Sequence, residues 1–110
     1  MGREFVILAD REPSVNEWGL CSGSLIGEGM VRGYEGGVTH LLDSHGNGLV
    51  AFWPARHIEE RREAVALVGD AAQRALLWID VAPRPDHEEL GVAIAAEMAR
   101  RADGILVEVP

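Results

Sequence analysis

Residues 75–109 read ALLWIDVAPRPDHEELGVAIAAEMARRADGILVEV and contain a strand, a helix and a second strand in succession. The apolar run at 75–82 predicts a buried strand. Apolar residues at helical spacing predict a helix over 88–102, and Gly104 is placed to end it. The β-branched residues at 105–109 predict a closing strand. This unit is similar to half of a split βαβ plait, in which a helix packs on an antiparallel sheet.

The predicted helix has a core face made of four residues, Leu90, Ala93, Ile94 and Met98. We expect this face to pack against the preceding strand through Leu76 and Trp78. Asp86 and Glu89 form a capping pattern at the start of the helix. Asp80 is the one charged side chain inside the strand, and alternation predicts that it points outward.

The N-terminal part of the chain adds a strand and a helix. Consecutive apolar residues between charged ones predict a buried strand over 4–9. Ser14 and Glu17 form a capping box for the following helix. Helical spacing predicts that four of its residues share one buried face: Val15, Trp18, Cys21 and Leu25.

A Gly-rich and β-branched segment over 26–53 predicts a β-meander. Its expected strands span 30–35, 38–43 and 49–53. Gly36-Gly37 and Asn47-Gly48 are the expected turns, and the second is the strongest hairpin signal in the chain. The Glu- and Arg-rich segment 57–68 predicts a further helix with a solvated charged face.

The predicted order of elements is therefore βαβββαβαβ. We expect a two-layer α+β sandwich, with a mostly antiparallel sheet and helices packed on one face. A length of 110 residues corresponds to one ordinary domain, which would span 1–110. A chain of this size buries enough surface to fold without disulfides or a structural metal.

Charge and cysteine content exclude several classes of function. Ten arginines against 18 aspartates and glutamates give a net charge of -8, which opposes binding to nucleic acid. Cys21 is the only cysteine, so an internal disulfide and a cysteine-based zinc site are excluded. The apolar runs are too short to span a bilayer, and the N-terminus lacks the apolar region of a signal peptide. We therefore expect a cytoplasmic bacterial protein that does not act at a membrane.

Sequence motifs for nucleotide binding, serine hydrolysis and zinc proteolysis do not occur. Strand-like sequence follows Gly27-Glu28-Gly29, which is therefore expected to form a turn and not a phosphate loop. Four histidines are too widely spaced for a metal motif: His40, His45, His57 and His87. A metal at His40 and Asp43 would need a third ligand from elsewhere in the chain. Cys21 lies on an apolar helix face, which does not suit a nucleophile.

One further group of side chains could support acid–base chemistry. Asp80, Asp86 and His87 would form it if they converged at one edge of the sheet. The alternative is that Asp86 caps the helix and Asp80 alternates outward. We favour this alternative and expect no catalytic residue, no metal and no cofactor.

The C-terminal quarter of the chain carries a resemblance. Its residues are Asp86-His87-x-x-Leu90-Gly91, then Ala93, Ala96, Ala99-Arg100 and Gly104-Ile105-Leu106-Val107. This pattern resembles the last helix and strand of small bacterial proteins of the immunity type, which neutralise a toxin by binding it. The resemblance implies a small acidic binding protein that blocks a toxin with a basic surface.

The candidate partner-binding residues are acidic side chains on two predicted segments: Glu28, Glu35, Glu59, Glu60 and Glu63. Acidic groups steer the approach of a basic protein. Two alternatives remain open at this point. One is a small enzyme with a site of unusual composition, and the other is an oligomeric ligand-binding domain with an apolar pocket near Trp53 or Trp78. The oligomeric state is also open.

Overall fold

The computed structural model describes residues 3–25, 27 and 29–110. Its helices and strands follow one another in this order: β1 (Phe5–Ala9), α1 (Val15–Leu25), β2 (Met30–Gly33), β3 (Thr39–Leu42), β4 (Gly48–Phe52), β5 (Arg56–His57), α2 (Arg61–Val68), β6 (Leu77–Pro83), α3 (Glu88–Arg101) and β7 (Ile105–Glu108). All strand pairs are antiparallel, in the order β2-β3-β4-β6-β1-β7. The short strand β5 follows β4 along the same edge of β6. Within the described residues, no helix has the length and apolar character needed to cross a membrane.

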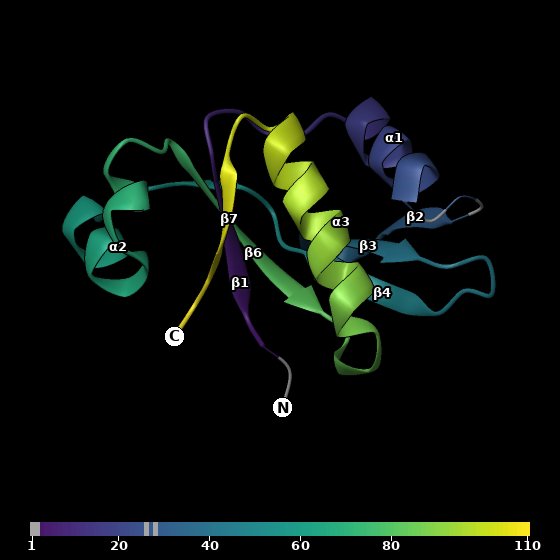
Figure 1. Ribbon diagram of the computed structural model, residues 1–110. Coiled ribbons are helices and arrows are strands. Elements are labelled where there is room, and N and C mark those ends of the chain that lie inside the picture. Colours follow the sequence, from purple (N-terminus) through teal and green to yellow (C-terminus); the bar gives the residue numbers. More distant parts are fainter. Residues whose placement is uncertain (1–2, 26, 28) are drawn as a thin grey trace.

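The predicted α+β class, with a mostly antiparallel sheet, is confirmed. The helices α1 and α3 pack on one face of the sheet, as Figure 1 shows. Because β1 lies between β6 and β7 and is antiparallel to both, β6-α3-β7 forms a split βαβ unit.

Strand β1 explains how the sheet forms a core on both faces. Its alternating side chains belong to two different clusters, because successive residues of a strand point to opposite faces. Phe5, Ile7 and Ala9 pack with α1 and α3, whereas Val6 and Leu8 belong to the second cluster. A strand covered on both faces is apolar without interruption, as this one is.

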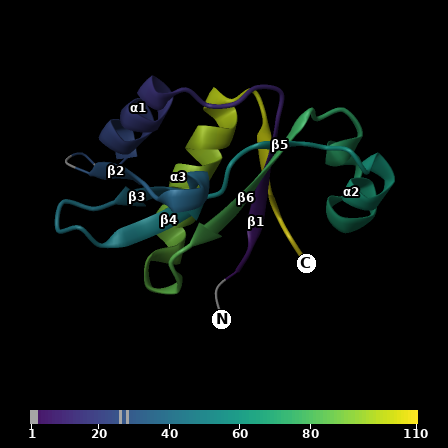
Figure 2. The ribbon, with the colours of Figure 1, turned by 180° about the vertical axis from the view of Figure 1, so that it is seen from behind.

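The second cluster lies under α2 and is smaller. It combines the residues of β1 with Trp78 of β6 and with Ala64 of α2. Both views of the ribbon place α2 at the opposite end of the molecule from α1 (Figure 1, Figure 2). This second face of the sheet is therefore covered by a helix at one end only.

The start of α2 differs from the prediction. Residues 57–60 were expected to be helical, but Arg56–His57 form β5, and the backbone N–H of Ile58 donates to the carbonyl oxygen of Leu76 at 3.1 Å. Strand β4 pairs only with the C-terminal part of β6, so the backbone N–H and C=O groups near the buried Trp78 need other hydrogen-bond partners. Residues 56–58 supply these partners and are therefore extended, not helical. The helix begins only at Arg61.

The hairpin between β3 and β4 is present, but its turn is not the predicted two-residue one. The loop spans 43–47 and begins at Asp43, whose carboxylate accepts hydrogen bonds from the backbone N–H groups of His45 and Asn47, both at 2.9 Å. These bonds hold the pKa of Asp43 below its ordinary value. Gly46, with φ of 83°, takes the left-handed conformation, and Gly48 belongs to β4.

The predicted core face of α3 is correct for Ile94 and Met98 and wrong for Leu90 and Ala93, which are exposed. The helix is rotated because Gly91 faces the sheet. A Cβ atom there would lie 2.8 Å from the carbonyl oxygen of Leu49, so only glycine allows this close approach.

Four other sequence predictions, three about the core and one about a helix cap, are corrected. Leu76 lies before β6 and is exposed, while Trp78 packs on the α2 side and not against α3. Val15 of α1 is 86% exposed because it lies at the helix terminus, although Cys21 of the same predicted face is buried. Asp86 does not cap α3 with its side chain; it lies in the 3₁₀ turn Pro85–His87.

Candidate protein-binding groove

The pairing of β5 with β6 brings the side chains of Arg56, Trp78 and Asp80 onto one face of the sheet. Arg56 is directly opposite Trp78, and Asp80 follows two residues later on the same side of β6. The indole Nε1–H of Trp78 donates to Asp80 Oδ1 at 2.9 Å. Arg56 Nη2 donates to Asp80 Oδ2 at 3.4 Å, and the guanidinium carbon of Arg56 lies 5.6 Å from the centre of the Trp78 ring.

A groove of about 460 Å³ lies between this cluster and the start of α2, and we call it the α2 groove. Its apolar lining consists of four residues: Ile58, Ala64, Leu67 and Trp78. Its acidic lining consists of three: Glu59, Glu60 and Glu63. A second hollow of about 380 Å³, the Trp53 hollow, shares Arg56, Leu67 and Trp78 with the groove and also reaches Trp53 and Asp80.

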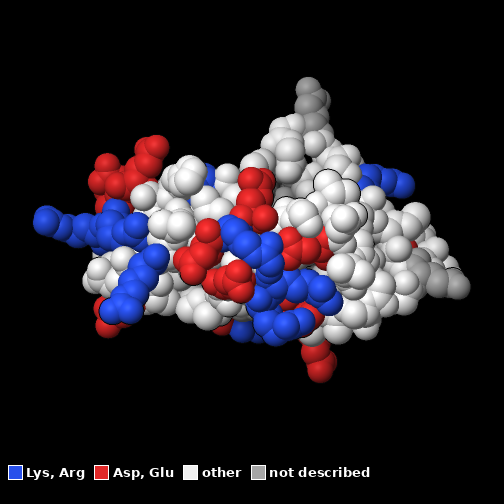
Figure 3. All heavy atoms as spheres, turned by 90° about the horizontal axis from the view of Figure 1, so that it is seen from above, with Lys and Arg blue, Asp and Glu red and all other residues white. Residues whose placement is uncertain are grey.

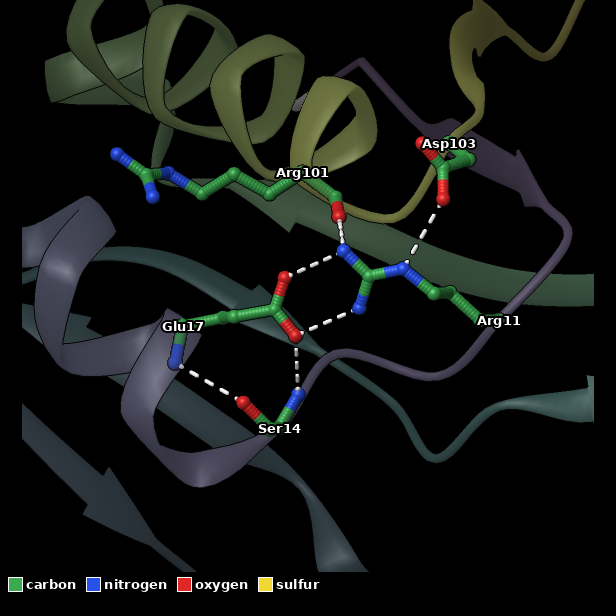
Figure 4. A network of polar contacts seen from close by, with 5 residues as sticks. All are labelled: Arg11, Ser14, Glu17, Arg101 and Asp103. Carbon is green, nitrogen blue, oxygen red and sulfur yellow. Dashed lines mark hydrogen bonds and ion pairs between the residues drawn. The ribbon is translucent and has the colours of Figure 1, made fainter.

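Many acidic side chains elsewhere are neutralised by arginine. Figure 4 shows Arg11 bound to both carboxylate oxygens of Glu17 at 2.7 and 2.8 Å, to Asp103 at 3.0 Å and to the carbonyl oxygen of Arg101. The predicted capping box is present in the same network, since Ser14 and Glu17 exchange hydrogen bonds of 3.0 and 3.3 Å. The hydrogen bonds from Arg11 are the main reason that the pKa of Glu17 falls to about 2.

Further ion pairs neutralise acidic side chains, both between distant segments and within α3. Arg3 contacts Glu88 and Glu108, each at 2.6 Å, and Arg100 contacts Glu97 at 2.6 Å. Figure 3 shows the result from above, with acidic and basic side chains interleaved over the middle of the molecule.

The three glutamates of the α2 groove differ from these paired groups. All three are exposed, and the described part of the chain shows no ion pair to any of them. Glu60 is the N-cap residue of α2 and Glu63 lies in its first turn, where the helix dipole favours negative charge. The groove thus combines an apolar wall with three glutamates that make no ion pair in the described chain, and Arg56 also lines it.

The structure brings together three of the five acidic residues selected from the sequence. Glu59, Glu60 and Glu63 line the same groove, although only Glu63 lies within a helix. Glu28 lies outside the described residues, and Glu35 begins the 3₁₀ turn Glu35–Gly37 between β2 and β3.

Sequence reasoning did not assign Arg56 or Asp80 to a binding site. The spacing of Trp78 and Asp80 contained a usable signal, because residues two apart in a strand share a face. Arg56 gave no such signal, since its position depends on β5 and on the register between β5 and β6.

The residues considered for chemistry do not assemble in the structure. Among the described residues, no group of three or more His, Cys, Asp and Glu side chains is placed to hold a metal. Burial raises the pKa of the Cys21 thiol to about 11, and its S–H donates to the carbonyl oxygen of Ile94 at 3.6 Å. Asp86 and His87 line a hollow at the start of α3, whereas Asp80 lines the Trp53 hollow. Asp80 and Asp86 therefore line different hollows, and the expected side-chain cap by Asp86 is absent.

Comparisons with known proteins found no match to this chain among family models, curated proteins or solved structures.

Proposed function

We propose that this chain is a binding protein that neutralises a basic protein partner in the bacterial cytoplasm, as an immunity protein neutralises its toxin. The observation that carries the proposal is the α2 groove, where Glu59, Glu60 and Glu63 have no cationic partner in the described chain and border an apolar wall.

The two parts of the groove would contribute differently to binding. Glutamates without an ion-pair partner attract a basic surface over distances of about 8 Å at physiological salt, which accelerates association. The apolar wall, with Leu67 45% exposed beside Trp78, offers contact area that is removed from water in the complex. Charge would therefore set the association rate, and apolar contact would set the lifetime of the complex.

The experiment uses the products of genes adjacent to the one that encodes this chain. Each product is expressed alone, and one that arrests growth is tested for rescue by this chain. Association of the purified pair is then measured by stopped-flow fluorescence at several salt concentrations.

The variant for this measurement carries Glu59→Lys, Glu60→Lys and Glu63→Lys. Its matched control carries Glu12→Lys, Asp86→Lys and Glu89→Lys, which change the net charge equally at exposed positions outside the groove. We expect the groove variant to associate at least about tenfold more slowly at low salt, with a flatter salt dependence than the control. Equal rates for the two variants, or no rescue by this chain of any adjacent toxic product, would contradict the proposal.

A further inference from the structure

We propose that Trp78 and Asp80 form a binding site for a guanidinium group, which anchors an arginine side chain of the basic partner, and that Arg56 of this chain occupies the site in the free protein. The inference rests on the proposed function, because it names the chemical group by which a basic partner is recognised.

The geometry of Trp78 and Asp80 matches what a guanidinium group binds. Arginine stacks on aromatic rings and donates planar hydrogen bonds to carboxylates, and both kinds of acceptor are present here. The bond from the Trp78 indole to Oδ1 orients the Asp80 carboxylate, while Oδ2 accepts the hydrogen bond from Arg56. The chain's own arginine thus shows which ligand chemistry the site accepts.

Arg56 is held loosely enough to be exchanged. Its contact with Asp80 is long, at 3.4 Å, and the two side chains are 65% and 48% exposed. Exposed ion pairs contribute little net stability, so displacement costs little. Arg11 provides the contrast, because it makes shorter hydrogen bonds to both Glu17 and Asp103.

The location of the site connects it to the acidic groove. Arg56 and Trp78 line both the α2 groove and the Trp53 hollow, so the site lies where the two meet. A basic segment that is attracted by the three glutamates meets Trp78 in the groove and Asp80 in the adjoining Trp53 hollow. Arg56 then acts as an internal competitor that lowers the apparent affinity for the partner.

The first test measures binding of two labelled synthetic peptides by fluorescence anisotropy at low salt. One peptide alternates arginine with glycine, and the other replaces each arginine with lysine. We expect the wild-type chain to prefer the arginine peptide, because lysine neither stacks as a plane nor donates paired hydrogen bonds.

Asp80→Asn removes the charge and keeps an amide oxygen that accepts the bond from Trp78. We expect it to weaken arginine-peptide binding about tenfold, since hydrogen bonds to charged groups are the strong ones. The control is Asp70→Asn, which removes the same charge at an exposed residue outside the groove. Equal effects of the two substitutions would overturn the site.

Arg56→Gln tests the competition. If Arg56 occupies the site about two-thirds of the time, its removal strengthens arginine-peptide binding about threefold. Arg62→Gln is the matched control, because Arg62 is exposed on α2 and does not line the groove. The same gain in both variants would be a general charge effect and would overturn the role of Arg56 as competitor.

The outcomes separate this inference from the proposed function. If the three-glutamate variant weakens peptide binding and Asp80→Asn does not, the result supports the role of the acidic groove and overturns the guanidinium site. If Asp80→Asn weakens peptide binding and the three-glutamate variant does not, the result supports the guanidinium site and overturns the role of the glutamates. If neither wild type nor Arg56→Gln binds the arginine peptide, the site is overturned, and the kinetics with the protein partner alone decide the proposed function.

Discussion

Two positions one turn apart on α3 provide a direct test of how this helix packs. Ile94 is fully buried in the main core, whereas Leu90, which the sequence pattern also assigns to the core face, is 36% exposed. We compare Ile94→Ala with Leu90→Ala, which remove the same number of carbon atoms from the same helix. The free energy of unfolding is expected to fall much more for the first substitution.

The magnitude follows from burial. At about 0.8 kcal/mol for each buried carbon, Ile94→Ala loses about 2.4 kcal/mol of transfer free energy. The cavity left under α3 brings the total to about 3–4 kcal/mol. Leu90 is about two-thirds buried, so the same arithmetic gives about 1.5 kcal/mol, and water can fill the space that is left.

The assay is urea unfolding followed by tryptophan fluorescence, with thermal melts as a second measurement. For a chain of this length, a loss of 1 kcal/mol lowers Tm by about 4 °C. We therefore expect Tm to fall by about 12–16 °C for Ile94→Ala and by about 6 °C or less for Leu90→Ala. Equal losses at the two positions would show that α3 is not rotated as described, and our account of its packing through Gly91 would be refuted.

Two more predictions concern titratable groups. The pKa of Glu17 is about 2 in the folded chain, whereas its ordinary value is 4.5, so the interaction with Arg11 stabilises the fold above about pH 4.5 and is lost as the pH falls toward 2. Glu17→Gln should therefore lose less stability than the wild type over this pH range, as urea titrations would show. An unchanged pH profile would contradict the role of the pair. Burial and a pKa near 11 predict that the Cys21 thiol resists alkylation by iodoacetamide at pH 8 in the native protein and reacts quickly in urea, as mass spectrometry would show. Rapid modification of the native chain would mean that α1 does not pack Cys21 against Ile94 of α3.

Local sequence patterns predicted most helices and strands of this protein. The strand expected over 4–9 is Phe5–Ala9, and the helix expected over 88–102 is Glu88–Arg101. The capping box of Ser14 and Glu17 was also correct. These features depend on residues close together in the chain, so periodicity and short-range hydrogen bonding are sufficient to find them.

The α2 groove could be predicted only in part. The run of charged residues over 59–63 pointed to Glu59, Glu60 and Glu63, because a charged stretch of sequence indicates an exposed surface. The partnership of Arg56 with Trp78 and Asp80 was not accessible, since it requires β5 to pair with β6 across about twenty residues of intervening chain.

The amino-acid pattern alone was sufficient for the α+β class, the approximate segments and the acidic character of the chain. Tertiary packing decided that β1 lies between β6 and β7, that Gly91 turns toward the sheet and that Leu90 turns away from it. It also decided that Trp78 packs under α2 and not under α3. The reason is that hydrophobic burial has no direction of its own, so an apolar residue specifies that it is buried, and the close fit of the surrounding backbone specifies where.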